Sequence, residues 1–443
     1  MSDFNKQNNL RKKNDLKQSV DRLKRGVGAI RKDPLKKGGA IVFYFAVLVL
    51  LWTHRHEVLG YSSGDPLAPL NDLLAGLVAG TSALAVPTAL TWAWGGPIGA
   101  GKVQDNLMRA GVVNAIGEAP TLTSKEKDPN SPNITTYTFR SCGISLAAWM
   151  DSTDKIQTAL NRTIADIRYG ADHQHIQIAT VPPTTILPNY ITYHNRLLPC
   201  EQTVLLLGRS ALGAVTIDLR TIPHLIIGGS TNSGKTTILK VLLLQCVQHG
   251  MEVYVADFKG AVDFGAWWAD HCDVTDSLNG LVQTLEKFCA ELERRKELFR
   301  AAGCSNIEQY NAQTTQHLRR MVFATDEAAF VFDKSGKTKE EKELIDKIAA
   351  KLSIITAQGR AFGLHTFLST QRPDAQVFPP FVRSNIDTRI CGRADKVLSE
   401  IILGSTIADE LIPKTSQGRF VLNDGCGSNV TVFQSYCLPD LTP

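Results

Sequence analysis

The chain has 443 residues, which allows two to four domains, and 43% of them are hydrophobic while 21% are charged. This composition excludes a disordered, collagen-like or disulfide-scaffold protein. The formal net charge of +5 is unevenly distributed. Residues 1–37 hold twelve Lys or Arg and four Asp, a net charge of +8, so the remainder of the chain sums to −3 (5 minus 8). The basic excess therefore lies entirely in an N-terminal arm.

Apolar residues in this arm recur at spacings of three and four, which predicts one helical face among basic side chains. Such a helix is typical of a segment lying on anionic lipid, of a solvated topology signal, or of a nucleic-acid contact. Residues 38–53 and 73–101 follow, and both stretches lack Asp, Glu, Lys and Arg. We expect a membrane region over residues 38–101, because a helix of ~20 residues crosses a bilayer core.

The two transmembrane helices are expected at about 38–54 and 73–95. The intervening loop carries one Arg against three acidic residues, whereas the arm is strongly basic. The positive-inside rule then predicts a multi-pass protein of the plasma or inner membrane with both termini in the cytoplasm. Two buried helices of a soluble domain, or a signal peptide for the first stretch, are the alternatives.

Residues 102–199 are expected to form a small α+β cytoplasmic module. Residues 134–139 and 176–181 have the pattern of strands, and residues 145–169 have a helical pattern. Residues 121–132 are rich in Lys, Ser, Asp and Pro, which suits a linker or an exposed loop. No catalytic constellation is present in this module, so we expect a structural role.

From about residue 204 apolar strands alternate with helical patterns, which predicts an α/β domain with a parallel sheet and helices on both faces. A strand at 225–227 and a helix at 238–248 flank a phosphate-binding loop in its required setting. Its predicted ATP-binding residues are Gly229, Ser230, Thr231, Asn232, Ser233, Gly234, Lys235, Thr236 and Thr237. Backbone N–H groups would surround the phosphates, Lys235 would reach the β- and γ-phosphates, and the Thr236 hydroxyl would ligate Mg²⁺.

A second strand pattern ends at Asp326 and Glu327, 91 residues after Lys235 (326 minus 235). We expect Asp326 to hold Mg²⁺ through water and Glu327 to activate the attacking water. A strand at 252–256 falls between the two motifs, which predicts an added strand between the nucleotide-motif strands and a RecA-like P-loop ATPase. A third strand ends at Gln371, which would sense the γ-phosphate or orient water; a simple strand cap is the alternative.

Several segments besides the phosphate-binding loop resemble the FtsK/SpoIIIE DNA translocases and their relatives in conjugative transfer. They are residues 207–219, 223–235, 257–260, 292–295, 298–299, 306–307, 310–311, 358–365, 370–373, 385–390 and 418–420. The resemblance covers about residues 200–443 and implies an FtsK-like, RecA-type motor domain there. Asn232 stands where many members of the family have Gly, and Phe258 replaces a Pro.

The resemblance also implies a homo-oligomer, a hexameric ring that threads DNA and hydrolyses ATP at subunit interfaces. Arg389 and Arg360 are the candidates for an interface arginine that stabilises the transition state. Lys334, Lys337 and Lys339 are candidate DNA contacts, although a charged run is more often a solvated face. Residues 200–443 leave no room for the winged-helix guide domain of the chromosomal members of the family. Two transmembrane helices are expected here, whereas those members have four.

The expected function is therefore that of a membrane-anchored, ATP-driven DNA translocase, the coupling protein that moves DNA to a secretion channel in conjugation. Its implied partners are DNA, the membrane, and a relaxase or secretion-channel proteins. One alternative is a DNA translocase of chromosome segregation or sporulation. The others are a protein-secretion ATPase of the type VII kind and a membrane-anchored regulatory nucleotide binder.

Overall fold

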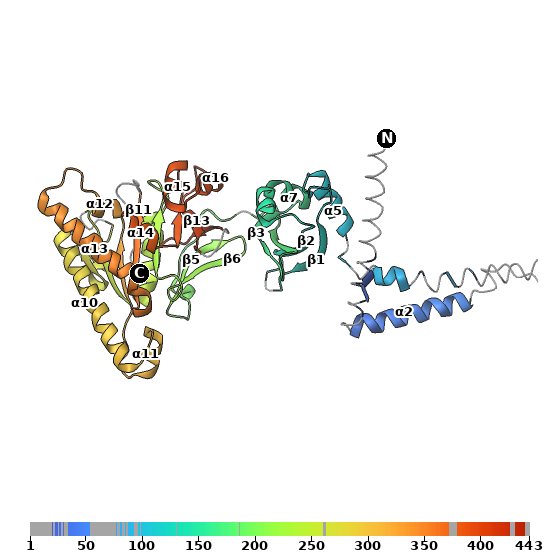
Figure 1. Ribbon diagram of the computed structural model, residues 1–443, viewed down its shortest axis with the longest axis horizontal. Helices are drawn as coiled ribbons and strands as arrows, with labels where there is room; N and C mark the ends of the chain where they lie inside the picture. Colours follow the sequence, from blue (N-terminus) through green and yellow to red (C-terminus); the bar gives the residue numbers. More distant parts are fainter. Residues whose placement is uncertain are drawn as a thin grey trace, which may run out of the picture. The chain divides into compact units, whose positions relative to one another are not determined.

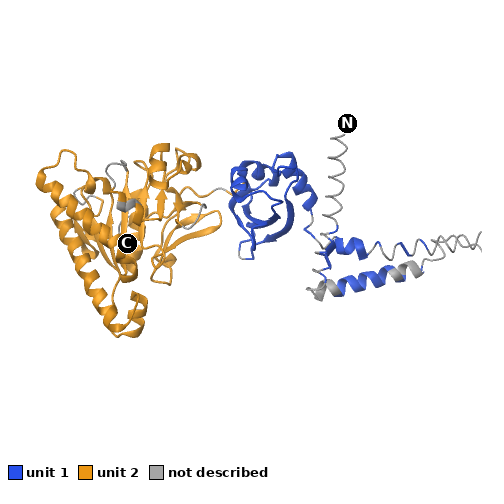
Figure 2. Ribbon diagram, in the orientation of Figure 1, with its two compact units in different colours: residues 1–183 blue, residues 184–443 orange. Residues whose placement is uncertain are grey.

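The computed structural model divides the chain into two compact units, residues 1–183 and 184–443 (Figure 2). From residue 99 onward it describes everything except residues 130, 186, 260–262, 372–378, 426–429 and 439–443. Before residue 99 it describes residues 34–53, 87–92, 96 and 97 and the single positions 20, 23, 24, 26, 27, 30, 77, 80, 81 and 85.

The N-terminal part of the first unit contains helix α2 (Pro34–Thr53), which covers the first expected transmembrane helix. Among the residues that the structure describes, no helix is both long and apolar enough to cross a membrane. The expectation of two membrane-spanning helices at 38–54 and 73–95 is therefore not supported by the described helices. Most of residues 73–95, the intervening loop and most of the basic arm lie outside the described residues.

The rest of the first unit is a small α+β module around a four-stranded antiparallel sheet with the order β1-β2-β4-β3. Phe139, Trp149 and Ile176 are fully buried and centre its core. Its elements are α5 (Ala100–Arg109), β1 (Thr121–Lys127), β2 (Thr135–Arg140), α6 (Leu146–Asp151), α7 (Thr153–Leu160), β3 (Thr163–Tyr169) and β4 (His175–Val181).

Two expectations for this module were wrong. The polar stretch 121–132 is not a loop throughout, because Thr121–Lys127 forms the edge strand β1 paired with β2. Charged side chains are common on edge strands, where one side of the strand faces solvent. Residues 145–169 are not one helical segment either. Asn161 adopts a left-handed conformation (φ 49°) that ends α7, and strand β3 follows.

The second unit is built on a ten-stranded mixed sheet with the order β6-β5-β14-β13-β12-β7-β11-β10-β8-β9. The six strands from β12 to β9 are parallel, and the other four extend the sheet in antiparallel fashion. Their bounds are β5 (Val204–Ser210), β6 (Gly213–Asp218), β7 (His224–Gly228), β8 (Glu252–Ala256), β9 (Asp273–Thr275), β10 (Met321–Thr325), β11 (Leu364–Thr370), β12 (Arg389–Cys391), β13 (Arg419–Asn423) and β14 (Thr431–Ser435).

Helices cover both faces of this sheet, as the sequence predicted. Consecutive residues of β10 point to opposite faces: Val322 packs into the core that contains α8, whereas Phe323 packs into the core formed with α10 and α13. Helices α10 and α13 lie side by side (Figure 1). The helices are α8 (Lys235–Gln248), α9 (Ala266–His271), α10 (Leu278–Ala302), α11 (Ile307–Gln313), α12 (Ala328–Phe332), α13 (Lys339–Phe362), α14 (Pro380–Asn385), α15 (Lys396–Leu403) and α16 (Ile407–Leu411), with a short 3₁₀ turn at Asn195–Leu197.

The strand inserted between the two nucleotide-motif strands is β11, not the expected strand 252–256. β11 pairs in parallel with β7 on one side and with β10 on the other, whereas β8 lies beyond β10. Every residue of β11 is buried, as befits a central strand of a parallel sheet. The RecA-like arrangement is therefore present, but it is β11 that supplies the added strand.

The boundary between the module and the α/β domain also differs from the expected position at residue 199. Residues 187–193, which we call the strap, pack on the second unit. Tyr193 is 3% exposed within its core, and its backbone N–H donates to the Cys437 carbonyl (2.8 Å). Thr192 and Cys437 form a parallel bridge, and Arg419 Nη2 donates to the Leu187 carbonyl (3.1 Å). A buried aromatic residue in the strap thus moves the boundary to residue 184.

Candidate active site

The carboxyl ends of five parallel strands bring the candidate functional residues to one edge of the sheet. The phosphate-binding loop (the P-loop, residues 229–236) follows β7, and Asp326 and Glu327 follow β10. Gln371 follows β11, Lys259 follows β8 and Arg393 follows β12. This edge is where open parallel sheets bind ligands, because loops from neighbouring strands converge there.

The P-loop has the curled backbone that phosphate binding requires. Gly229 (φ 151°), Asn232 (φ 63°) and Gly234 (φ 99°) all have positive φ. Asn is the non-glycine residue that best tolerates the left-handed region, which explains how it replaces the family's Gly. A Cβ atom at Gly234 would lie 3.1 Å from the Gly418 nitrogen, so the loop leaves little room there. The expected residues from Gly229 to Thr237 therefore form one loop and the first turn of α8.

Lys235 is buried at the N-terminus of α8, with 4% of its surface exposed. Its Nζ donates to the Ser230 carbonyl within the P-loop (3.0 Å). Burial lowers the pKa of Lys235 to about 8, although the nearby Glu327 and Asp326 carboxylates act in the opposite direction. A phosphate group placed in the loop would satisfy this ammonium group and restore its usual pKa.

The two residues expected to hold Mg²⁺ are in contact. The Thr236 hydroxyl donates to Asp326 Oδ1 at 2.7 Å, and Asp326 is 2% exposed. A hydroxyl and a carboxylate at the entrance to a phosphate site are the oxygen ligands that Mg²⁺ prefers, directly or through water. The residues therefore fit the ion, and their role as ligands stays a prediction.

Glu327 is held at the point where β10 and β11 end. It accepts hydrogen bonds from the Thr370 hydroxyl (2.7 Å) and from the Gln371 backbone N–H (3.1 Å to Oε2). The Gln371 side chain in turn accepts a hydrogen bond from the Thr231 hydroxyl of the P-loop (2.9 Å). Gln371 thus connects the P-loop to Glu327, which suits either of its predicted roles.

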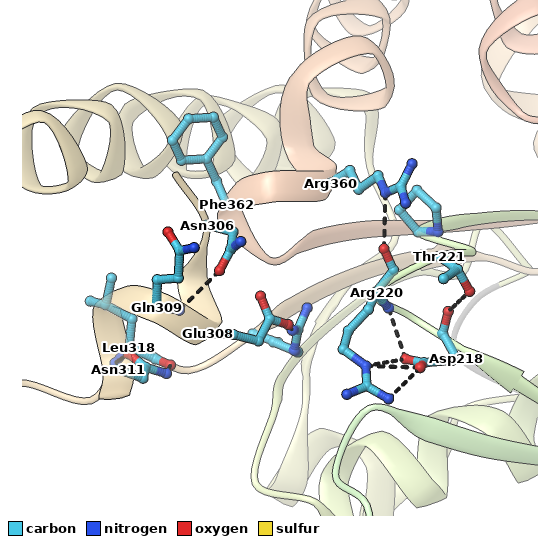
Figure 3. Close-up of polar contacts among 12 residues, drawn as sticks. Asp218, Arg220, Thr221, Asn306, Glu308, Gln309, Asn311, Leu318, Arg360 and Phe362 are labelled. Carbon is cyan, nitrogen blue, oxygen red and sulfur yellow. Dashed lines mark hydrogen bonds and ion pairs between the residues drawn. The ribbon is translucent and has the colours of Figure 1, made fainter. Parts of the chain in front are cut away.

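The two candidate interface arginines have different hydrogen-bond partners. Arg389 belongs to β12 and donates to the carbonyls of Ile386 (3.3 Å) and Ile402 (3.2 Å). Arg360 lies in the last turn of α13 and donates to the Arg220 carbonyl (2.9 Å), close to the ion pair between Arg220 and Asp218 (Figure 3). It therefore lies at the amino-terminal edge of the parallel strands, opposite the P-loop of its own chain. Whether either arginine reaches a neighbouring subunit's site stays a prediction.

Two of the three candidate DNA-contacting lysines take part in local ion pairs. Lys334 Nζ lies 2.5 Å from Asp346 Oδ1, and Lys337 Nζ lies 3.5 Å from Glu341 Oε1. The Thr338 side chain caps α13 beside them, with Glu341 completing the capping box. These contacts favour the alternative of a solvated charged face for Lys334 and Lys337.

Sequence reasoning missed two residues of the site. Lys259 Nζ lies 2.6 Å from Asp326 Oδ2; burial alone would lower its pKa, but the bonds to Asp326 and Asp263 raise it on balance. Arg393 donates to Ser230 Oγ (3.2 Å) and to the Thr231 carbonyl (2.7 Å). Lys259 belongs to a segment that resembles the family, and Arg393 follows another such segment, residues 385–390, but neither signal indicates a contact.

Comparisons with known proteins agree with this geometry. Residues 201–390 match the model of the FtsK/SpoIIIE family. The DNA translocase FtsK of Staphylococcus aureus is 30% identical over 227 residues, which cover 47% of this chain and 28% of that protein. The DNA translocase FtsK of Listeria monocytogenes is 25% identical over 375 residues, 77% of this chain and 46% of that protein. The chain thus spans less than half the length of these curated relatives.

One solved structure is similar to this chain over most of the length of both proteins. The pCW3 conjugation coupling protein TcpA, in its monomer form with ATPγS, is 29% identical and superposes with a TM-score of 0.57. The match covers 77% of this chain and 95% of that one. The similarity is therefore not confined to the family domain.

Proposed function

The chain carries a P-loop ATPase domain of the FtsK/SpoIIIE type, and from this premise we propose that it is a membrane-associated, ATP-driven DNA translocase that acts as a coupling protein in conjugation. One observation carries the proposal: the match to the coupling protein TcpA covers 95% of that chain. The FtsK relatives are matched over much smaller shares of their length. In this proposal, the residues at the carboxyl edge of the sheet would bind and hydrolyse ATP.

The chemistry is assigned to five side chains. Lys235 would neutralise the β- and γ-phosphates, and Thr236 with Asp326 would hold Mg²⁺, which supplies further positive charge to the transferred phosphoryl group. Glu327 would accept the proton of the attacking water while the bond between the γ-phosphorus and the ADP oxygen breaks. Gln371, fixed between the P-loop and Glu327, would orient that water.

The assembly and the cellular role are part of the same proposal. A hexameric ring would thread DNA and complete each site with an arginine from a neighbouring subunit. Residues 38–101 would attach the protein to the plasma or inner membrane with both termini in the cytoplasm, where a relaxase or channel proteins would meet it. Several large side chains of α2 support attachment, because Val42 and Phe45 are 69% and 67% exposed and such surfaces need cover.

The test compares ATP hydrolysis by the full-length protein with and without DNA. We expect DNA to stimulate hydrolysis, and Glu327→Gln to lower the rate by ~10²–10⁴-fold, the usual contribution of a general base. In cells that carry the mobile element, Lys235→Ala should abolish its transfer and leave growth normal.

Other outcomes would favour other functions. A defect in division or sporulation in the Lys235→Ala strain would indicate a chromosome translocase. Stimulation by a secreted peptide but not by DNA would indicate a protein-secretion ATPase. DNA binding without any hydrolysis would contradict the proposed role of Glu327, which its contacts with Thr370 and Gln371 support.

A further inference from the structure

The two oxygens of the Asp326 carboxylate have different partners. Oδ1 accepts the hydrogen bond of the Thr236 hydroxyl, and Oδ2 lies 2.6 Å from Lys259 Nζ. The Asp326 side chain is only 3% exposed, so its charge is largely removed from water. A buried carboxylate without a cation is strongly unfavourable, and here Lys259 supplies that cation.

Lys259 has a second carboxylate within reach. Its Nζ also lies 3.2 Å from Asp263 Oδ2, and the Asp263 side chain is 31% exposed. The backbone N–H of Lys259 donates to Oδ1 of the buried Asp257 (3.0 Å), which fixes the point from which the Lys259 side chain extends. The ammonium group therefore sits on a flexible stem between one buried and one partly exposed carboxylate.

The charges around Lys259 allow its ammonium group to exchange one carboxylate partner for the other. Lys240 of α8 lies over the Phe264 ring, 5.3 Å from its centroid, and it faces the same carboxylates as Lys259. Asp263 would thus keep a cationic neighbour in either position of Lys259. Among the described residues, Lys259 is the cation in direct contact with Asp326, whereas Lys235 and Lys240 act on it from further away and Thr236 donates only a neutral hydrogen bond.

We propose that Lys259 is a built-in counter-ion that competes with Mg²⁺ for Asp326, and that it transfers to Asp263 when nucleotide binds together with Mg²⁺. The inference rests on the proposed Mg²⁺ site and adds a regulation of that site. Lys259 keeps the carboxylate neutralised between nucleotides. It also sets the Mg²⁺ concentration at which nucleotide binds tightly, because it must release Asp326 first.

The test is a Mg²⁺ titration of the binding of a fluorescent ADP analogue to the full-length protein. Lys259→Met removes the competitor, so the Mg²⁺ midpoint should fall roughly tenfold, the change that ~1.4 kcal/mol produces. Asp263→Asn removes the second acceptor and keeps Lys259 on Asp326, so the midpoint should rise. Lys287→Met is the matched control, since Lys287 forms a surface ion pair with Asp273, and its midpoint should equal that of the wild type.

A second readout does not require nucleotide. In EDTA, Lys259→Met should melt at a lower temperature than the wild type, because Asp326 loses the cation in direct contact with it, and added Mg²⁺ should restore part of the loss. Asp263→Asn retains the buried ion pair and tests the proposal even where Lys259→Met does not fold. Midpoints that move in the same direction in both variants, or not at all, would overturn the competition between Lys259 and Mg²⁺ but not the proposed Mg²⁺ site. A wild type whose ADP binding ignores Mg²⁺ would instead overturn the proposed Mg²⁺ site.

Discussion

Lys235 acquires its properties from where the fold places it. A lysine side chain in water has a pKa near 10.4, and burial lowers the pKa of Lys235 to about 8. The P-loop carbonyl of Ser230 satisfies one of its protons but supplies no formal charge. The free protein therefore has an ammonium group that a phosphate can stabilise strongly.

This environment predicts that nucleotide affinity depends on pH. Well below pH 8 Lys235 is charged, so the nucleotide affinity should be at its maximum. Above pH 8 the free protein loses this proton, and the affinity should fall by up to tenfold per pH unit. Dissociation constants of a fluorescent ADP analogue between pH 7 and pH 9.5 measure this. In Lys235→Arg the guanidinium keeps its charge throughout, so its curve should be flat. A flat curve for the wild type would show that Lys235 is not the titrating group.

At the level of elements, β12 and β13 support the P-loop although neither carries a residue of the P-loop itself or of the pair Asp326–Glu327. Arg393, just after β12, bonds to Ser230 and Thr231 and also donates to the Lys414 carbonyl (2.9 Å). The Gly418 N–H, before β13, donates to the Ser233 carbonyl (2.9 Å). The P-loop is therefore held from outside as well as by its own strand and helix.

Arg393→Ala should weaken nucleotide binding about tenfold, because the P-loop loses part of the support that keeps it in its phosphate-binding shape. The free energy of unfolding should fall only by ~1–2 kcal/mol, since these hydrogen bonds lie near the surface. Calorimetry of ADP binding and urea unfolding separate the two effects. Arg220→Ala, at the opposite edge of the sheet, is the control and should keep the affinity. Equal affinity of Arg393→Ala and the wild type would contradict the support role.

These elements also show what the sequence can predict. The P-loop and the pair Asp326–Glu327 were predictable because each depends on a local strand pattern followed by residues of fixed chemistry. The place of β11 was not, since strand order is decided by pairing between distant segments. Lys259 was missed for the same reason: its partner Asp326 lies 67 positions further along the chain. The strand Thr121–Lys127 was missed because its polar composition is also that of a loop.

For the molecule as a whole, the strap decides where the second unit begins. A fragment of residues 187–443 should be more stable than one of residues 201–443, because the shorter fragment exposes the cavity that Tyr193 fills. The loss should be at least about 3 kcal/mol, as for other buried aromatic side chains. Urea unfolding of both fragments measures it, and Tyr193→Ala in the longer fragment should reproduce most of the loss. Equal stability of the two fragments would indicate that the folded domain begins at about residue 200.

The bonds between the strap and the end of the chain have a mechanical consequence. Thr192 and Cys437 are paired in parallel, and backbone hydrogen bonds join Tyr193 to Cys437 and Cys437 to Ile191. These bonds tie the strap to the segment that follows β14, whose last residue is Ser435. A force applied to the strap would therefore reach the sheet through β14, at the far end of the chain sequence from the P-loop.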